Sequence, residues 1–210
     1  MKVHFILKVW PLVIGCLLLF AAISFATIDV PVARFCAQFQ LAGNVVSHGL
    51  SSIVLLTLAA MAIGTLLIIR LHSGKLSALN EAILISTVAA ICTYALNDGV
   101  LKPFLGVPSP ETVLHTGLKH QFQILNASNY IAGFPSGHMA MASAFAGVLM
   151  RLQPRWKWWL TALLSIGGLA LIVGVWHFIS DVLAGAAVGC TAGYLASELW
   201  LAHRAKNPTR

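Results

Sequence analysis

The sequence predicts an all-α protein, an integral membrane bundle of six transmembrane helices. Only 9% of its 210 residues are charged and 59% are hydrophobic, whereas soluble domains carry about 25% charged residues. Six apolar runs each approach the roughly 20 residues that a helix needs to cross a bilayer. We therefore expect one membrane domain over residues 1–210.

The six apolar runs are the predicted spans, and they cover residues 5–27, 49–71, 79–101, 131–150, 158–176 and 178–201. The first run also resembles a secretory signal, because Ser-Phe-Ala at 24–26 is typical of a signal-peptidase site. Its apolar core is long for such a signal, which favours a retained first helix. Whether the first helix is retained stays open at this point.

The lysines and arginines predict how the helices are oriented. Ten of them lie in the N-terminus, the 70–78 and 151–157 loops and the C-terminal tail, and three lie in the other segments: Arg34, Lys102 and Lys119. By the positive-inside rule both termini are then cytoplasmic, and the loop at about 103–130 is extracytoplasmic. We expect the protein in a bacterial inner membrane. The net charge of +7 reflects this topology and does not indicate nucleic acid as a partner.

Gly133 to His138, with the sequence Gly-Phe-Pro-Ser-Gly-His, opens the fourth run. A turn that leads into a helix leaves backbone N–H groups unpaired at the positive end of the helix dipole, where a phosphate binds readily. His138 adds a side chain that moves protons near neutral pH. A simple loop-to-helix turn is the alternative. We take Ser136 and Gly137 as candidate phosphate-binding residues.

The predicted topology brings further polar residues to the same membrane face as His138. Lys102 ends the third run there, and His177 and Asp181 begin the sixth. Four residues apart on a helix, His177 and Asp181 are within reach of each other, and a carboxylate on one imidazole nitrogen makes the other a better nucleophile. A capping pair is the alternative interpretation for these two, and a helical ion pair with Asp98 is the alternative for Lys102.

The cysteines point to no disulfide framework and no zinc site. Three lie inside apolar runs and one just after a run, without a CxxC or Cys/His ligand spacing: Cys16, Cys92, Cys190 and Cys36. We expect small apolar packing residues, and neither a metal nor another cofactor.

Lys102, Pro135-Ser136-Gly137-His138 and the pair of His177 and Asp181 together resemble the type 2 phosphatidic acid phosphatase superfamily. Its motifs are Lys, six residues, Arg-Pro; then Pro-Ser-Gly-His; then Ser-Arg, five residues, His, three residues, Asp. The resemblance covers about residues 97–185. It implies that His177 attacks phosphorus to form a phosphohistidine and that Asp181 orients it. His138 would then protonate the leaving oxygen, and Lys102 and the amides at Ser136 and Gly137 would hold the phosphate.

Both arginines of the family motifs are replaced in this chain. Ser109 stands in the first motif, and Leu171, preceded by Ala170, stands in the third. One catalytic arginine can contribute roughly a thousandfold to phosphoryl transfer. His115, Lys119 or His120 from the loop are candidate substitutes, although a solvated loop is the simpler interpretation of these three.

The sequence therefore favours a membrane lipid phosphatase, or a lipid phosphotransferase, that acts on a lipid phosphate or diphosphate monoester. The resemblance allows phosphatidic acid, phosphatidylglycerophosphate, polyprenyl diphosphate and lipid A phosphates, and the sequence does not choose among them or between hydrolysis and transfer. The loss of both arginines keeps open a catalytically impaired member that binds or moves a phospholipid. A transporter is disfavoured, because transporter sites lie near the midplane of the membrane. The oligomeric state stays open.

Overall fold

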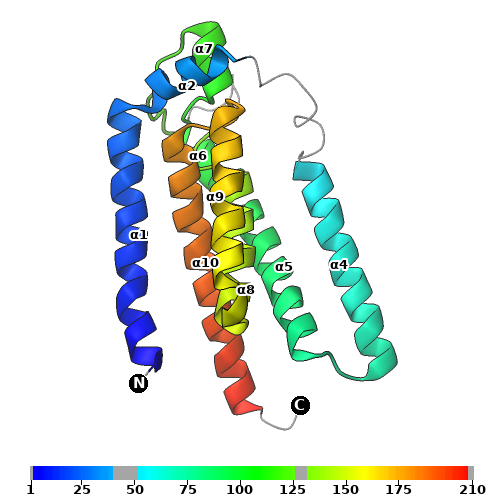
Figure 1. The fold of residues 1–210 in the computed structure, drawn as a ribbon. Coiled ribbons are helices and arrows are strands. Elements are labelled where there is room, and N and C mark those ends of the chain that lie inside the picture. Colours follow the sequence, from blue (N-terminus) through cyan, green and yellow to red (C-terminus); the bar gives the residue numbers. More distant parts are fainter. Residues whose placement is uncertain (1, 40–51, 126–131, 208–210) are drawn as a thin grey trace.

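The computed structural model describes residues 2–39, 52–125 and 132–207, which form a bundle of long helices with short helices at one end (Figure 1). The long helices are α1 (Lys2–Thr27), α4 (Ser52–Ser73), α5 (Ala78–Leu96), α8 (Gly137–Leu152), α9 (Lys157–Val173) and α10 (Ile179–Lys206). The shorter elements are α2 (Asp29–Ala37), the π-helix η2 (Asn97–Leu101), α6 (Lys102–Leu105), α7 (Pro110–Thr116) and the 3₁₀-helix η3 (Pro154–Trp156).

The membrane-spanning helical bundle is confirmed, but the predicted number of six spans is not. Within the described residues, five segments are long and apolar enough to cross a membrane: 10–27, 56–73, 78–105, 154–173 and 179–206. The predicted span at 131–150 corresponds to α8, which has only 16 residues and rises about 24 Å. Six spans therefore stay a prediction. Residues 49–51 and 131 of the predicted runs lie outside the described residues.

The centre of the bundle is the close packing of α8 against α10. Three glycines at four-residue spacing line one face of α10: Gly185, Gly189 and Gly193. A Cβ atom at each would lie 2.5, 2.1 and 2.6 Å from a backbone oxygen of the chain at or in α8. Small residues at this spacing let two membrane helices approach until their backbones touch. This contact sets the position of both helix starts, where the candidate site residues lie.

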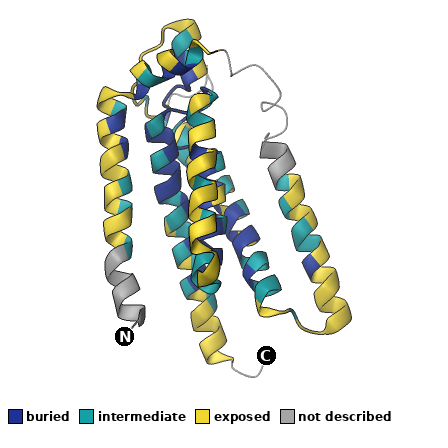
Figure 2. Ribbon diagram, in the orientation of Figure 1, coloured by how far each residue is buried: buried dark blue, intermediate teal, exposed yellow. Residues whose placement is uncertain are grey.

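The other long helices surround this pair and present apolar side chains outward. α5 packs on α8 and α10, α1 packs on α10, α9 packs on α8, and α4 packs on α5. Figure 2 shows mostly exposed residues along α1, α4 and α9 and buried residues along α10. The exposed residues include Leu18, Leu58 and Leu163. Such large exposed apolar surfaces mark contact with lipid.

The two ends of the bundle differ. α2 and α7 lie across the end at which α10 begins, while α1 begins and α10 ends at the opposite end (Figure 1). The segment predicted as a loop at 103–130 contains α7 and most of α6, and its residues 126–130 lie outside the described part of the chain. Which end faces the cytoplasm stays a prediction.

Candidate active site

His177 and Asp181 form a buried pair at the start of α10. Nδ1 of His177 lies 3.3 Å from Oδ2 of Asp181, and the same carboxylate oxygen accepts a hydrogen bond from the Phe178 N–H at 2.9 Å. Asp181 is fully buried and His177 is 8% exposed. Because Nδ1 meets the carboxylate, Nε2 is the nitrogen left for chemistry. The structure thus brings these two predicted residues together.

His138 lies in the first turn of α8, facing the same region as His177. The two imidazole ring centroids are 6.2 Å apart, and the His138 centroid is 5.9 Å from the Trp176 ring. This separation is within the range of ordinary aromatic contacts, and both rings border the same pocket. A phosphorus atom bound in that pocket would have a candidate nucleophile and a candidate proton donor beside it.

Ser136 and Gly137 begin α8 as predicted, but Ser136 has partners within the protein. Its Oγ accepts from the Met139 N–H at 3.3 Å, and its own N–H donates to the Asp181 carbonyl oxygen at 3.0 Å. Ser136 thus ties the start of α8 to the start of α10. Because the Ser136 N–H already donates a hydrogen bond, the predicted binding of phosphate by backbone N–H groups is left to Gly137 and the rest of the first turn of α8.

Two neighbours position the turn before α8. Asn97, the first residue of the π-helix, is fully buried and donates through Nδ2 to the Pro135 carbonyl at 3.0 Å. Gly133 packs so closely that a Cβ atom there would lie 3.0 Å from Oδ2 of Asp181 and 3.0 Å from Cα of Ser109. π-helical turns occur frequently at functional sites. The polar end of the third predicted run therefore serves to hold the turn.

Lys102 reaches the same region but shares its charge with a carboxylate. Its Nζ lies 2.6 Å from Oδ1 of Asp98, and Oδ2 of Asp98 accepts from the Tyr94 hydroxyl at 3.2 Å. The Tyr94 ring in turn borders Gly137. The helical ion pair considered from the sequence is thus present, and it is compatible with a position beside the site.

A pocket of about 620 Å³, the polar pocket, borders several of these residues and is lined by charged and polar side chains together with apolar ones. Its lining includes Lys102, His138 and His177 of the predicted set, together with Ser109, Glu111, His115, Gly133, Val175 and Trp176. Val175 has a φ of +60°, which is strained for a β-branched residue, and such strain concentrates at functional sites.

The two residues that replace the motif arginines lie in different surroundings. Ser109 does line the pocket, but its Oγ caps α7 by accepting from the Thr112 N–H at 3.3 Å. Leu171 is not among the lining residues, since it packs with Met139 and Val182 in an apolar cluster. Its carbonyl accepts from the N–H groups of Trp176 and His177. Position 171 thus shapes the site through its backbone.

The three loop cations that were candidate substitutes do not gather in one place. His115 lines the pocket. Lys119 is exposed and is not among the lining residues. His120 lies in a separate cluster, where its Nε2 is 3.0 Å from Oδ2 of Asp29. Of the three, only His115 is placed to meet a bound phosphate.

The cluster around Asp29 was not anticipated from the sequence. Asp29 is 2% exposed and accepts from the Ser24 hydroxyl at 2.7 Å and the Ser180 N–H at 3.1 Å. The Ser180 hydroxyl also donates to it, in a short hydrogen bond. Burial acts to raise the pKa of Asp29, but the hydrogen bonds from His120, Ser180 and Ser24 outweigh it and lower this pKa. The only sequence sign was an acidic residue at the end of an apolar run.

An apolar groove of about 500 Å³ meets the polar pocket at His138. It lies among α4, α5, α8 and α9, and its lining is otherwise almost entirely hydrocarbon, with Leu58, Ile83, Met141, Phe145 and Leu163 among its residues. His138 lines both spaces.

One comparison with known proteins identifies a family. Residues 78–205, which hold every predicted site residue, match the family model of the PAP2 superfamily. The fold is similar to a solved transmembrane PAP2 type phosphatidylglycerolphosphate phosphatase from Bacillus subtilis, at 17% identity and a TM-score of 0.48, covering 90% of this chain and 96% of that one. Among curated proteins there is no significant match.

Proposed function

Because the chain belongs to the PAP2 superfamily, we propose that it is a membrane lipid phosphatase that works through a phosphohistidine. The observation that carries this proposal is the position of His138, which borders both a polar pocket and an apolar groove. A lipid phosphate needs both spaces, one for its charged group and one for its hydrocarbon chain. The substrate class is therefore a phosphate or diphosphate monoester of a lipid.

In the first step, Nε2 of His177 attacks phosphorus while Asp181 holds Nδ1, the protonated nitrogen. The bond between phosphorus and the ester oxygen breaks, and His138 gives its proton to that oxygen. Asp181 stabilises the positive charge that develops on the His177 imidazole. Lys102 and the amides at the start of α8 hold the remaining phosphate oxygens. The products are the dephosphorylated lipid and a phosphohistidine.

In the second step, a water molecule gives a proton to His138 while its oxygen attacks phosphorus. The bond between phosphorus and Nε2 of His177 breaks, which releases phosphate and restores both histidines. A second lipid hydroxyl in place of water would make the same protein a phosphotransferase. The site faces the extracytoplasmic side, as the distribution of lysine and arginine favours.

The decisive test is phosphate release from a panel of phosphatidic acid, phosphatidylglycerophosphate, polyprenyl diphosphate and lipid A phosphates. We expect His177→Ala to lower turnover of the preferred lipid by at least about a thousandfold. His138→Ala should let a labelled phosphohistidine accumulate if its main loss is in the second step. His72→Ala, an exposed histidine at the other end of the bundle, is the matched control. Unchanged activity in His177→Ala would refute the mechanism.

The pH dependence of turnover tests both histidine roles together. One imidazole must be neutral to attack and the other protonated to donate, so the profile should be bell-shaped, and its limbs belong to the coupled pair. A flat profile between about pH 5 and 8 would contradict both roles.

A second function, phospholipid binding without turnover, is favoured by one observation. Ser109 occupies the pocket where the family motif has an arginine, and Lys102 shares its charge with Asp98. Vanadate, a phosphate mimic, separates the two proposals. Thermal protection by vanadate without a trapped intermediate or turnover on the panel would favour the binding protein.

A further inference from the structure

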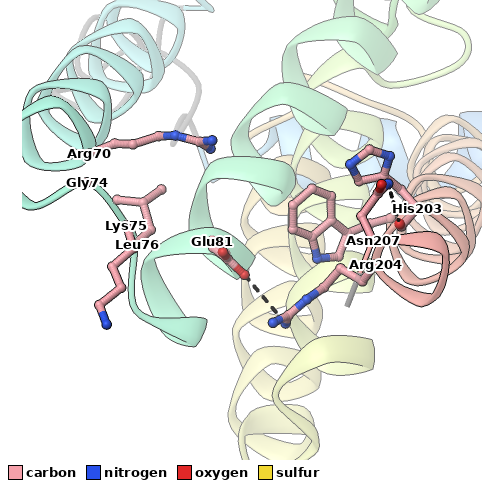
Figure 3. Close-up of a pocket in the computed structure, with 9 residues that line it drawn as sticks. Arg70, Gly74, Lys75, Leu76, Glu81, His203, Arg204 and Asn207 are labelled. Atoms are coloured by element: carbon pink, nitrogen blue, oxygen red, sulfur yellow. Dashed lines mark hydrogen bonds and ion pairs between the residues drawn. The ribbon is translucent and has the colours of Figure 1, made fainter. Parts of the chain in front are cut away.

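A second pocket lies at the opposite end of the bundle from His177. α10 has 28 residues and so rises about 42 Å between the two ends. The pocket, of about 330 Å³, lies among the end of α4, the start of α5 and the end of α10 (Figure 3). Its lining consists of Arg70, Gly74, Lys75, Leu76, Glu81, Trp200, His203, Arg204 and Asn207.

The turn between α4 and α5 builds one wall of this pocket. Gly74 has a φ of +69°, and its N–H donates to the Arg70 carbonyl at 2.8 Å, which ends α4. Three residues later the Ser77 hydroxyl accepts from the Asn80 N–H at 3.2 Å and starts α5. This short connection holds Arg70 and Lys75 beside the first turn of α5. Figure 3 shows Arg70 extending from α4 toward α5 and the Lys75 side chain extending in a different direction from the turn.

The pocket carries more positive than negative charge. Glu81 pairs with Arg204 at 3.5 Å. All six acidic residues of the chain lie in the described part, and within that part none of them forms an ion pair with Arg70 or Lys75. A basic residue in the last turn of a helix also offsets the helix dipole. This accounts for Arg70, and the positive-inside rule accounts for a cation in the turn beyond α4, where Lys75 lies.

Another wall of the pocket comes from α10. The Trp200 ring stacks on the His203 ring with centroids 5.8 Å apart and 25° between the planes. Asn207 donates through Nδ2 to the His203 carbonyl at 3.2 Å. Tryptophan is enriched where membrane meets water. The pocket thus combines two cations that pair with no acidic residue in the described part of the chain with a tryptophan, a residue typical of the depth at which lipid headgroups lie.

We propose that this pocket binds a phosphate group, and specifically the phosphodiester of an anionic phospholipid in the leaflet opposite the His177 pocket. The Arg70 guanidinium can hold two phosphate oxygens at once, and Lys75 adds a point charge. The same chemistry would accept a soluble phosphate ester. The proposal does not depend on the catalytic activity proposed above.

The experiment measures phosphatidylglycerol binding to the purified full chain by native mass spectrometry, with phosphatidylcholine, a zwitterionic lipid without net charge, as the reference. Phosphatidylglycerol has no phosphate monoester for His177 to attack. Each basic residue near a membrane surface contributes roughly fivefold, so the double variant R70Q/K75Q should weaken binding about twenty-fivefold. The charge-preserving R70K/K75R should retain most of it. The matched control R155Q/K157Q removes two exposed cations from the same end, outside the pocket.

Each outcome decides the proposal. Loss in R70Q/K75Q alone supports the pocket. Equal weakening in the two double-glutamine variants, or in neither, would overturn it, since general surface charge or another site would then explain the binding. Glycerol 3-phosphate, tested as a competitor, distinguishes the two sources. Competition at concentrations near that of the lipid indicates a soluble ester, and its failure indicates a membrane headgroup.

Discussion

Two carboxylate–imidazole pairs lie beside the first turn of α10. They differ in the surroundings of the imidazole nitrogen that does not contact the carboxylate. Asp181 holds His177 through Nδ1 at 3.3 Å, and His177 lines the polar pocket. Asp29 holds His120 through Nε2 at 3.0 Å. The His120 ring lies between the rings of Phe25 and Phe178, with centroid distances of 4.2 and 4.1 Å.

The difference shows that a paired histidine is a reactive group only where a pocket reaches it. The two histidine side chains are almost equally buried, 9% exposed for His177 and 5% for His120. The other nitrogen of His120, Nδ1, is buried and has no hydrogen-bond partner in the described part of the chain. The pair at Asp29 therefore acts as a structural clamp that joins α1, the 103–130 segment and α10. The pair at Asp181 borders the pocket and is the one to which the proposed function assigns the reaction.

The largest expected contrast is in turnover. Asp181→Asn should lower kcat about a thousandfold, because the amide no longer fixes the tautomer that leaves Nε2 of His177 unprotonated. Asp29→Asn should lower kcat less than about tenfold, because His120 touches no reacting atom. Steady-state phosphate release by the two purified variants measures this. Equal losses would erase the distinction between the pairs.

The contrast reverses for stability. Asp29 accepts four hydrogen bonds from three segments, so Asp29→Ala should cost about 3 kcal/mol, as expected for breaking a buried pair. Asp181→Ala should cost about 1 kcal/mol, the usual value of a helix cap, since Oδ1 of Asp181 has no described partner. Thermal unfolding in detergent compares the two. A larger loss in Asp181→Ala would mean that the clamp is misassigned.

A glycine that touches one pair only provides a smaller and more local change. In Gly133→Ala the new methyl group would lie 3.0 Å from Oδ2 of Asp181, so we expect the carboxylate to shift from His177 and kcat to fall about tenfold. Gly167→Ala is the control, because a Cβ there meets nothing within 4 Å. Turnover that stays at the wild-type level in both variants would show that the Asp181 position tolerates displacement.

The smallest expected effect is the pH dependence that Asp29 adds to stability. Its pKa is lower in the folded protein than the ordinary 3.8, so its stabilisation is complete well above that value and is lost as the pH falls through the folded pKa. The wild-type Tm should therefore drop on acidification below about pH 4, and Asp29→Asn should show a shallower drop. Tm measured from neutral to acidic pH checks this. If the Tm of the wild type and of Asp29→Asn fell in parallel on acidification, Asp29 would not be the source of the pH dependence.

The helices and the order of the site residues were predictable, because apolar runs and local spacing carry that information. His177 and Asp181 are four residues apart, as expected for a helical pair, but His177 lies just before α10, and Asp181 in the first turn reaches back to it and to the Phe178 N–H. The membership in the PAP2 superfamily confirms the resemblance drawn from Lys102, the Pro-Ser-Gly-His turn and this pair. The roles of these residues stay predictions. The cluster at Asp29 was not predictable, since Ser24, His120 and Ser180 are far apart in the chain.

By itself, the sequence determined that the chain crosses a membrane and which residues open the two central helices. Those features depend on local composition and on neighbours three or four residues apart. Only the tertiary structure decided that the Ser136 N–H donates to the Asp181 carbonyl oxygen, that Ser109 caps α7 inside the pocket, and that His120 belongs to the clamp. The reason is physical: a polar group in a buried site takes whichever partner the packing of distant segments brings within about 3 Å. The glycine face of α10 against α8 sets much of that packing.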